Sequence, residues 1–201
     1  MIRYMSRFLE SIAIVEGQIQ RLHWHQRRVD HTLSTFYKGA TLDLYAAIYE
    51  KARQQTGSVK CRVLYDADSC EVQFSTYSPR IVRTLKLVED NDIDYSFKFS
   101  DRSALNHAFD QRGENDDILI VKNGRITDST IANIVFRRDE KWFTPREPLL
   151  NGTMREYLLE NGRLTEEDIG VRDLSSFHGY KLINALLAFT SDEYPVSNIH
   201  F

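Results

Sequence analysis

The sequence predicts a mixed α+β fold, with helices and strands interspersed in two lobes. Two early segments carry apolar residues at helical spacing, and many short runs rich in β-branched and aromatic residues are separated by turn residues. The 201 residues are 42% apolar, which is enough for a sizeable core without a disulfide or a metal. An acidic, polar run at residues 89–94 divides the chain. We therefore expect a small α+β lobe at residues 1–92 and a larger α/β lobe at residues 93–201.

The first half is expected to form one strand, two helices and then a β-rich region. Glu16-Gly17 is a turn signal after the first strand, and the polar run at 66–69 has the turn chemistry of a hairpin. The predicted strands are 8–15, 58–65, 71–77 and 81–88, and the predicted helices are 22–36 and 41–54. This mixture of helices and strands favours an α+β lobe.

The second half is richer in short strands. Asn123-Gly124 predicts a tight type I′ turn between two of them, and Gly162 is expected to end a helix. The predicted strands are 118–122, 125–127, 132–137, 142–144 and 194–199. The predicted helices are 102–111 and 152–161, with a helix start at 165–168 and a buried strand or helix at 181–189.

Composition narrows the functional classes. The 26 Lys and Arg residues are outnumbered by 29 Asp and Glu residues, so we expect no nucleic-acid partner. Neither a signal peptide nor a membrane-spanning run is recognisable, so we expect no membrane association. The only two cysteines are Cys61 and Cys70, which favours a reducing, cytoplasmic location. His23 and His25 flank Trp24 without a third ligand, so we interpret His25 as a packing residue and expect no metal.

Three segments could carry chemistry. Lys98 lies between Phe97 and Phe99, where desolvation would favour its neutral, nucleophilic amine. The polar residues at 127–133 could hold a polar heterocycle, and the glycine-containing loop at 150–155 opens a helix that could bind phosphate. Taken one at a time, simpler interpretations are favoured: a solvated edge lysine, a turn capped by its own side chains, and an ordinary helix start.

These segments recur with others in a fixed order along almost the whole chain. The motifs are Phe8-Leu9-Glu10-Ser11-Ile12, His25-Gln26-Arg27-Arg28-Val29, Lys98-Phe99-Ser100-Asp101-Arg102, Asp128-Ser129-Thr130-Ile131-Ala132-Asn133-Ile134, Trp142-Phe143-Thr144-Pro145, Leu150-Asn151-Gly152-Thr153-Met154-Arg155, Asn184-Ala185-Leu186-Leu187 and Pro195-Val196. Together they resemble the class IV aminotransferase family, whose members are fold-type IV enzymes that use pyridoxal 5′-phosphate (PLP). The resemblance is closest to 4-amino-4-deoxychorismate lyase-like members. It implies a D-amino-acid aminotransferase-like fold, shortened at the N-terminus.

The resemblance also implies roles for individual residues. Lys98 would form the internal aldimine with PLP and later move the α-proton of the substrate. Asp128 would lie by the pyridine nitrogen, where the family usually has the longer glutamate. Arg28 would bind the cofactor phosphate by charge-assisted hydrogen bonds. The remaining implied phosphate contacts are backbone N–H groups of Thr153 and Met154, and the hydroxyl groups of Thr190 and Ser191.

Several functions are compatible with these residues. The Lys-x-x-Asp-Arg and Asn-Ala-Leu motifs favour a lyase that releases pyruvate and 4-aminobenzoate from 4-amino-4-deoxychorismate. Transamination of a branched-chain or D-amino acid starts from the same aldimine and stays open. A non-catalytic PLP-binding or dimerisation protein on the same fold is a further alternative. Because members of the family are usually homodimers, the resemblance implies a homodimer that acts on a small amino-acid-like substrate.

Overall fold

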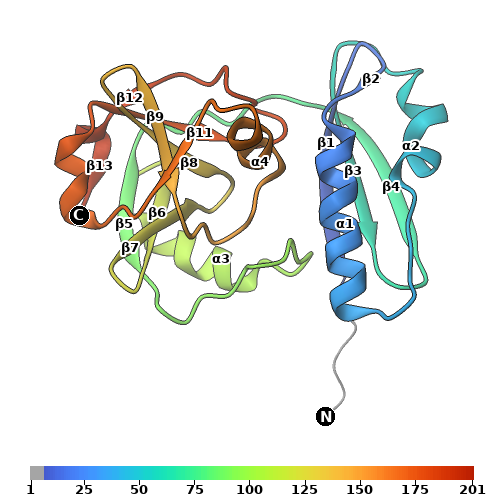
Figure 1. Cartoon of the computed structure of the whole chain (residues 1–201), viewed down its shortest axis with the longest axis horizontal. Coiled ribbons are helices and arrows are strands. Elements are labelled where there is room, and N and C mark those ends of the chain that lie inside the picture. The colour runs from blue at the N-terminus through green and yellow to red at the C-terminus, as the bar shows by residue number, and fades with distance from the viewer. Residues whose placement is uncertain (1–6) are drawn as a thin grey trace. The chain divides into compact units, whose positions relative to one another are not determined.

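The computed structural model describes residues 7–201 and divides them into two compact units (Figure 1). The first unit consists of the chain up to Pro79 together with the short segment Phe97–Asp101. Arg80–Ser96 and Arg102–Phe201 form the second unit. The sequence placed a single boundary between residues 92 and 93, and the structure differs from it. The reason is backbone pairing: residues 85–89 pair with a strand of the second unit, whereas residues 97–101 return to pair with the first strand.

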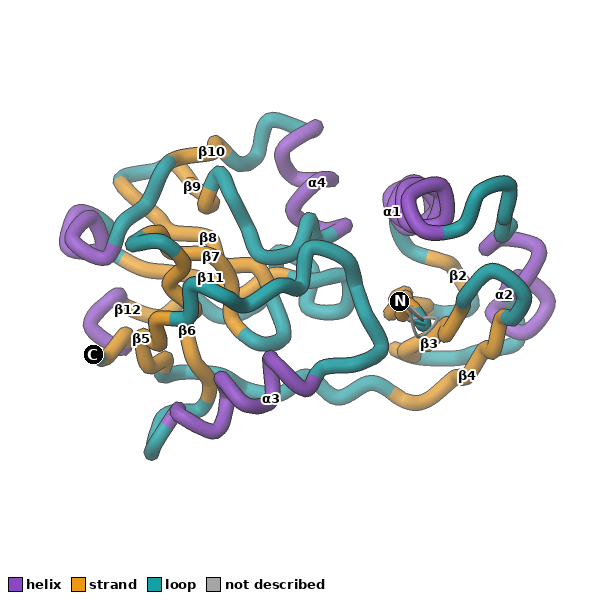
Figure 2. The backbone as a smooth tube through the Cα atoms, turned by 90° about the horizontal axis from the view of Figure 1, so that it is seen from below, coloured by secondary structure: helices purple, strands orange, loops and turns teal. Residues whose placement is uncertain are grey.

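The first unit is a four-stranded antiparallel sheet in the order β2-β1-β3-β4. Its strands are β1 (Phe8–Val15), β2 (Gln18–Ile19), β3 (Ser58–Tyr65) and β4 (Cys70–Thr76), and its helices are α1 (Leu22–Phe36) and α2 (Leu44–Ala52). Both helices lie over the same face of the sheet (Figures 1 and 2). Glu16 and Gly17 have positive φ angles of 47° and 75°, as a tight turn between β1 and β2 requires.

The core of the first unit lies between this sheet and its helices. Phe8, Ile12 and Ile14 of β1 are fully buried, because alternate residues of a strand face the same side. Helix residues Val29 and Leu33 pack against them in one hydrophobic cluster. Apolar residues that recur at every second position of β1 and about every 3.6 positions of α1 therefore pack against each other in one core.

The second unit contains a nine-stranded mixed sheet with the path β10-β9-β8-β7-β6-β5-β13, and β11 joins it at β8. Its strands are β5 (Leu85–Glu89), β6 (Asp117–Lys122), β7 (Arg125–Ser129), β8 (Asn133–Arg138), β9 (Lys141–Pro145), β10 (Thr165–Glu167), β11 (Gly179–Ile183), β12 (Tyr194–Pro195) and β13 (Ile199–His200). Its helices are α3 (Ser103–Phe109) and α4 (Thr153–Glu160), with 3-10 turns at Asp110–Arg112, Val171–Ser176 and Val196–Asn198. Figure 2 shows α3 and α4 on opposite sides of this sheet.

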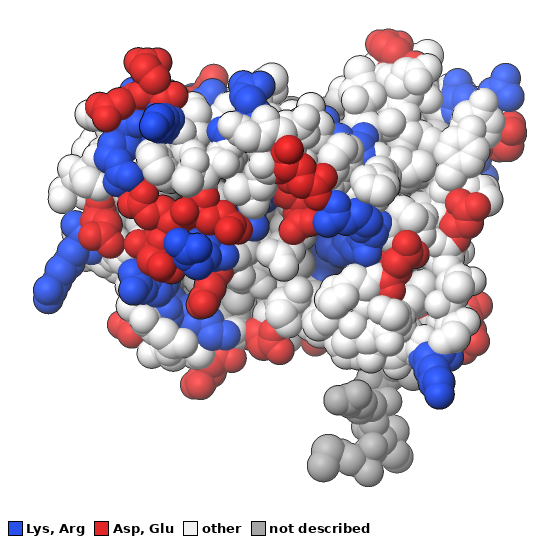
Figure 3. Space-filling model, viewed as in Figure 1, with Lys and Arg blue, Asp and Glu red and all other residues white. Residues whose placement is uncertain are grey.

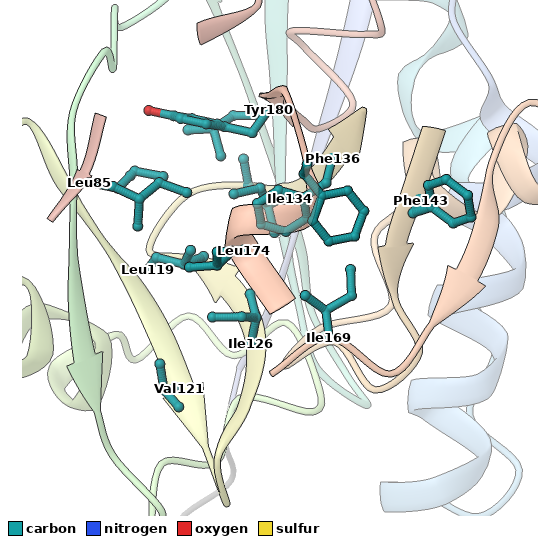
Figure 4. Packing of buried hydrophobic residues seen from close by; sticks show 14 of the residues in the cluster. Leu85, Leu119, Val121, Ile126, Ile134, Phe136, Phe143, Ile169, Leu174 and Tyr180 are labelled. Carbon is teal, nitrogen blue, oxygen red and sulfur yellow. The ribbon is translucent and has the colours of Figure 1, made fainter. Parts of the chain in front are cut away.

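A second hydrophobic cluster fills this unit (Figure 4). Ile134 and Phe136 of β8 and Tyr180 of β11 are fully buried within it, and Leu119 comes from β6. The hydroxyl of Tyr180 donates to the carbonyl of Arg83 at 2.9 Å, so its one polar atom is satisfied. Three residues of the motifs quoted above, Ala132, Ile134 and Phe143, belong to this cluster.

Most predicted elements are confirmed, and the exceptions have a common cause. Asn123 and Gly124 have φ angles of 51° and 75°, as the predicted turn requires. The predicted helix start at 165–168 is wrong, because Thr165–Glu167 pairs with β9 as a parallel strand. The strand expected at 194–199 is interrupted by a 3-10 turn. In both places pairing between distant segments overrides local preference.

Acidic and basic side chains are intermixed over the second unit on the face drawn in Figure 3, in keeping with the near balance of charge in the sequence. Within the described residues 7–201, none of the helices has the length and apolar character needed to span a membrane.

Candidate active site

The predicted cofactor lysine lies on a short extended segment beside β1. The N–H of Leu9 donates to the carbonyl of Lys98 at 2.9 Å, and Phe99 forms an isolated β-bridge with Phe8. The rings of Phe97 and Phe99 both pack on Phe36, with centroids 4.8 and 6.1 Å away. Lys98 itself is half-buried. The two aromatic neighbours therefore anchor the lysine segment in the core of the first unit.

Arg28 projects from α1 onto a carboxylate that the sequence interpretation had not assigned. Its Nε and Nη2 atoms donate to the two oxygens of Glu10 at 2.7 Å each, which is a bidentate ion pair. The ring Nδ1 of His25 lies 2.6 Å from Oε2 of the same carboxylate. Glu10 and His25 are fully buried, and the Arg28 side chain is 13% exposed.

The charges in this cluster decide its protonation. Burial by itself would raise the pKa of Glu10, but the Arg28 guanidinium and the hydrogen bonds from His25 and Arg28 outweigh it and lower the pKa to about 2. Burial lowers the pKa of His25, although Glu10 opposes this effect. Arg28 and Lys98 add to the lowering of the His25 pKa by charge repulsion. Lys98 is thus close enough to His25 for their charges to interact.

Asp128 is the corresponding buried carboxylate of the second unit. It lies on β7, is 4% exposed, and accepts hydrogen bonds from Asn133 Nδ2 at 2.8 Å and from the N–H of Leu150 at 2.9 Å. Burial is the dominant influence and raises the pKa of Asp128 to about 6, against smaller lowering effects of these donors and of Arg155. Its neighbours are mostly neutral, so a cation near this carboxylate would favour its ionised form.

Asn133 connects Asp128 to the loop that opens α4. Besides Asp128, its Nδ2 donates to the carbonyl of Leu150 at 2.8 Å. Gly152 approaches the same side chain so closely that a Cβ at residue 152 would overlap Oδ1 of Asn133. The glycine is therefore required by this close approach and not by a positive φ.

The start of α4 is the predicted phosphate-binding segment. Its N-cap is Gly152, which has no side chain to cap the helix, and Thr153 and Met154 in its first turn are each 3% exposed. The next residue, Arg155, is also buried, and it binds Glu166 at 2.7 Å and the carbonyl of Pro145 at 2.9 Å. These bonds hold the helix start against β9 and β10.

Thr190 and Ser191, the predicted hydroxyl pair, lie in the loop after β11. Ser191 donates to the carbonyl of Leu182 at 2.7 Å, and the exposed Thr190 donates to that of Leu187 at 3.3 Å. The adjoining Phe189 packs against a hydrophobic cluster that includes Met154. The structure thus brings this loop and α4 to one hydrophobic cluster.

A further buried carboxyl group supports the loop that follows Asp128. Asp117 is fully buried and accepts from the Thr130 hydroxyl at 2.7 and 3.0 Å, and burial raises its pKa. Arg102 donates to the carbonyl of Thr130 at 2.6 Å. These contacts hold residue 130 between β7 and β8.

The predicted residues fall into two groups. Lys98 and Arg28 lie in the first unit, and Asp128, Thr153, Met154, Thr190 and Ser191 lie in the second. Sequence reasoning missed the roles of Glu10, Asp117 and Arg155. A signal for Glu10 was available, because it is a charged residue in phase with Phe8 and Ile12 on an apolar strand.

The donor set is suited to an anionic, amine-reactive ligand. The first unit offers a lysine amine and an arginine, and the second unit, taken by itself, offers a helix start and a buried carboxylate. Within residues 7–201, no group of three or more His, Cys, Asp or Glu side chains is placed to hold a metal ion.

Comparison with known proteins adds a family context to this geometry. The family model described as amino-transferase class IV matches residues 7–193. An uncharacterized protein of Haemophilus influenzae is 39% identical over 185 residues, covering 90% of this chain and 98% of that protein.

Two solved structures extend the comparison. A "putative 4-amino-4-deoxychorismate lyase" from Haemophilus somnus has a TM-score of 0.84 and 34% identity, and the match covers 91% of this chain and 97% of that one. The PLP-bound form of a hypothetical aminotransferase from Mycobacterium tuberculosis has a TM-score of 0.80 and 15% identity, with 95% and 81% covered. At that identity the second likeness concerns the fold alone.

Proposed function

The chain belongs to the class IV aminotransferase family, which makes it a PLP-dependent lyase or aminotransferase, and from that premise we propose a 4-amino-4-deoxychorismate lyase-like activity. The observation that carries the lyase proposal is the likeness, over 91% of the chain at 34% identity, to a protein named for that reaction. The proposed products are pyruvate and 4-aminobenzoate.

The residues of each unit fit a part of PLP. Lys98 of the first unit offers an amine for the aldehyde, and Arg28 offers a guanidinium for the phosphate. Glu10 binds the Nε and Nη2 groups of this guanidinium and so fixes its orientation. The buried carboxylate of Asp128 suits the pyridine nitrogen, and the start of α4, with glycine as its N-cap, suits the phosphate. When bound, PLP supplies an aromatic ring that accepts electrons from the substrate.

The chain's own residues would then bind, orient and move protons. Lys98 Nζ would hold the cofactor and would later accept the α-proton of the substrate and return it. Asp128, ionised opposite a protonated pyridine nitrogen, would keep that proton in place. Asn133 and the Leu150 N–H orient the carboxylate for this role, which matters because aspartate is one methylene shorter than the glutamate usual in the family.

Asn184, from the motif that favours the lyase, has a defined position as well. Its Oδ1 accepts from the N–H groups of Leu186 and Leu187, and its Nδ2 donates to the carbonyl of Ile131 at 3.1 Å. It therefore links the loop after β11 to the loop between Asp128 and Asn133. This link supports a positioning role for Asn184 in the second unit.

The decisive experiment measures pyruvate released from 4-amino-4-deoxychorismate by the PLP-loaded protein without any added keto acid. We expect release by the wild type, a loss of at least about 10²-fold in Lys98→Ala, and no loss in Lys51→Ala, an exposed lysine on α2. Borohydride should fix the cofactor on a peptide that contains Lys98. Turnover by Lys98→Ala at the wild-type rate would contradict the catalytic role.

Aminotransferase activity is the second candidate, because the matching family model carries that description. It predicts no pyruvate from the lyase substrate, and transfer from a branched-chain or D-amino acid that depends on an added keto acid. A yellow protein with neither activity would instead indicate a PLP-binding protein. The homodimer and the cytoplasmic location stay predictions, and sedimentation and cell fractionation test them.

A further inference from the structure

Glu10 is a charged residue at a position where the fold otherwise places apolar side chains. Phe8, Glu10 and Ile12 point to the same side of β1, and all three are fully buried. A buried carboxylate is costly unless hydrogen bonds and charges compensate it. Here both oxygens are engaged, one by Arg28 and the other by Arg28 and His25. A core residue serving only to fill space would not need this arrangement.

The groups around Glu10 come from every element packed against it. Arg28 and His25 approach from α1. Tyr65 comes from β3, and the pKa of its phenol is raised mainly by burial and further by the charge of Glu10. From the segment 97–101, Lys98 acts on His25 by its charge. Glu10 therefore binds the arginine that the proposed function uses, and its other partner, His25, interacts with the lysine.

The hydrogen bonds determine which nitrogen of His25 carries its proton. An ionised carboxylate only accepts hydrogen bonds, so Nδ1, at 2.6 Å from Oε2 of Glu10, must be protonated. Burial lowers the pKa of His25, and a neutral ring then has an unprotonated Nε2 that accepts hydrogen bonds. The hydrogen bond to Glu10 is thus the interaction that selects the Nδ1–H tautomer of His25.

The strand that carries Glu10 also holds the lysine segment. Leu9, the preceding residue, donates its N–H to the carbonyl of Lys98 at 2.9 Å. Two neighbouring residues of β1 thus bind the two residues of the first unit assigned to the cofactor: Leu9 binds Lys98 through the backbone, and Glu10 binds Arg28 through its side chain. The adjacent residues Leu9 and Glu10 therefore determine the distance between the Lys98 backbone and the Arg28 guanidinium.

We propose that Glu10 is a positioning residue, which orients the Arg28 guanidinium relative to the Lys98 segment and holds His25 as its Nδ1–H tautomer with Nε2 as an acceptor. The arginine part rests on the proposed function, because it concerns phosphate binding. The histidine part does not, since it is a property of the protein without its cofactor.

The histidine part is tested by ¹⁵N NMR of the cofactor-free wild type, with the His25 signals assigned by their loss in His25→Gln. We expect a pyrrole-like Nδ1 and a pyridine-like Nε2 near neutral pH. In Glu10→Gln, whose amide can donate to Nδ1, the tautomer should reverse. A pyridine-like Nδ1 in the wild type would overturn the proposal without any variant having to fold.

The arginine part is tested by comparing affinities for PLP and for pyridoxal, which lacks the phosphate. We expect Glu10→Gln to reduce PLP affinity by about 10- to 100-fold while pyridoxal affinity stays within twofold. Arg28→Lys, which keeps a cation beside Glu10, should give the same selective loss with the wild-type tautomer. The matched control is Glu50→Gln, an exposed carboxylate 3.7 Å from Arg53, which should change neither affinity.

Equal losses of PLP and pyridoxal affinity in Glu10→Gln would mean a general structural role and would overturn the proposal. If the wild type bound neither compound, the proposed function and the arginine part would fail together. The tautomer measurement would then still decide whether Glu10 positions His25.

Discussion

Each unit buries a carboxylate beside or among the residues assigned to the cofactor, and the environments of Glu10 and Asp128 shift their pKa values in opposite directions. Glu10 of the first unit faces a guanidinium and an imidazole N–H, and its pKa falls to about 2. Asp128 of the second unit receives its hydrogen bonds from an amide side chain and a backbone N–H, and its pKa rises to about 6. Burial acts in the same direction on both, so the charge of the neighbours decides the outcome.

The difference in pKa means that the charge of Glu10 is constant, whereas the charge of Asp128 depends on its surroundings. Glu10 has its counter-ion within the chain and stays ionised at any physiological pH. Asp128, with a pKa of about 6, changes its charge near neutral pH, and a nearby cation such as a protonated pyridine nitrogen would hold it in the ionised form. In this comparison the constant charge of Glu10 positions Arg28 and His25 in the first unit, whereas the charge of Asp128 in the second unit responds to a cation that binds near it.

The largest expected effect comes from removing the counter-ion of Glu10. Arg28→Met would leave a buried carboxylate without its cation, and we expect the free energy of unfolding at pH 7 to fall by about 3–5 kcal/mol. Urea unfolding of the cofactor-free protein measures this. The loss should shrink near pH 4, where Glu10 can be protonated instead. Arg53→Met, in an exposed pair with Glu50, should cost no more than about 1 kcal/mol, and equal losses in the two variants would contradict the comparison.

The pH dependence of stability should show the two carboxylates with opposite signs. The pKa of Glu10 falls from 4.5 to about 2, so its contribution is complete above pH 4.5 and is lost as the pH falls toward 2. The pKa of Asp128 rises from 3.8 to about 6, so the stability it contributes is complete below about pH 4 and is lost as the pH rises to 6. Each shift corresponds to about 3 kcal/mol.

Urea unfolding between pH 3 and pH 7 measures both contributions as the difference between the wild type and Glu10→Gln or Asp128→Asn. The difference for Glu10→Gln should grow as the pH rises through 3 and 4, and that for Asp128→Asn should change in the opposite sense between pH 4 and 6. Differences of the same sign for both variants would refute the contrast.

A smaller effect is expected where Asp128 is oriented by its neighbours. In Gly152→Ala the new methyl group would overlap Asn133 Oδ1, so Asn133 must move and its bonds to Asp128 and Leu150 weaken. We expect a loss of about 1–3 kcal/mol in stability together with weaker PLP binding. Gly170→Ala is the matched control, because the nearest atom to its Cβ is 3.3 Å away on the Asp173 side chain. If both variants behaved alike, the close approach at Gly152 would have no special role.

Much of the fold followed from local patterns. The turn at Asn123-Gly124 and the helix at Thr153–Glu160 were predictable, because turn chemistry and helical periodicity are local properties. The helix start at 165–168 was wrongly predicted, since pairing with β9 is decided by a strand some twenty residues away. The boundary at 92/93 missed the return of residues 97–101 to β1 for the same reason.

The sequence by itself determined the family and the residues that could carry its chemistry, because the identity and order of motifs around Lys98, Asp128 and Gly152 are written directly in the chain. Only the tertiary structure decided what surrounds those residues. Glu10 and Arg28 are 18 positions apart, and nothing local in the sequence pairs them. Protonation depends on burial and on neighbouring charge, and both arise only when distant segments pack together. The opposite pKa shifts of Glu10 and Asp128 are therefore properties of the fold.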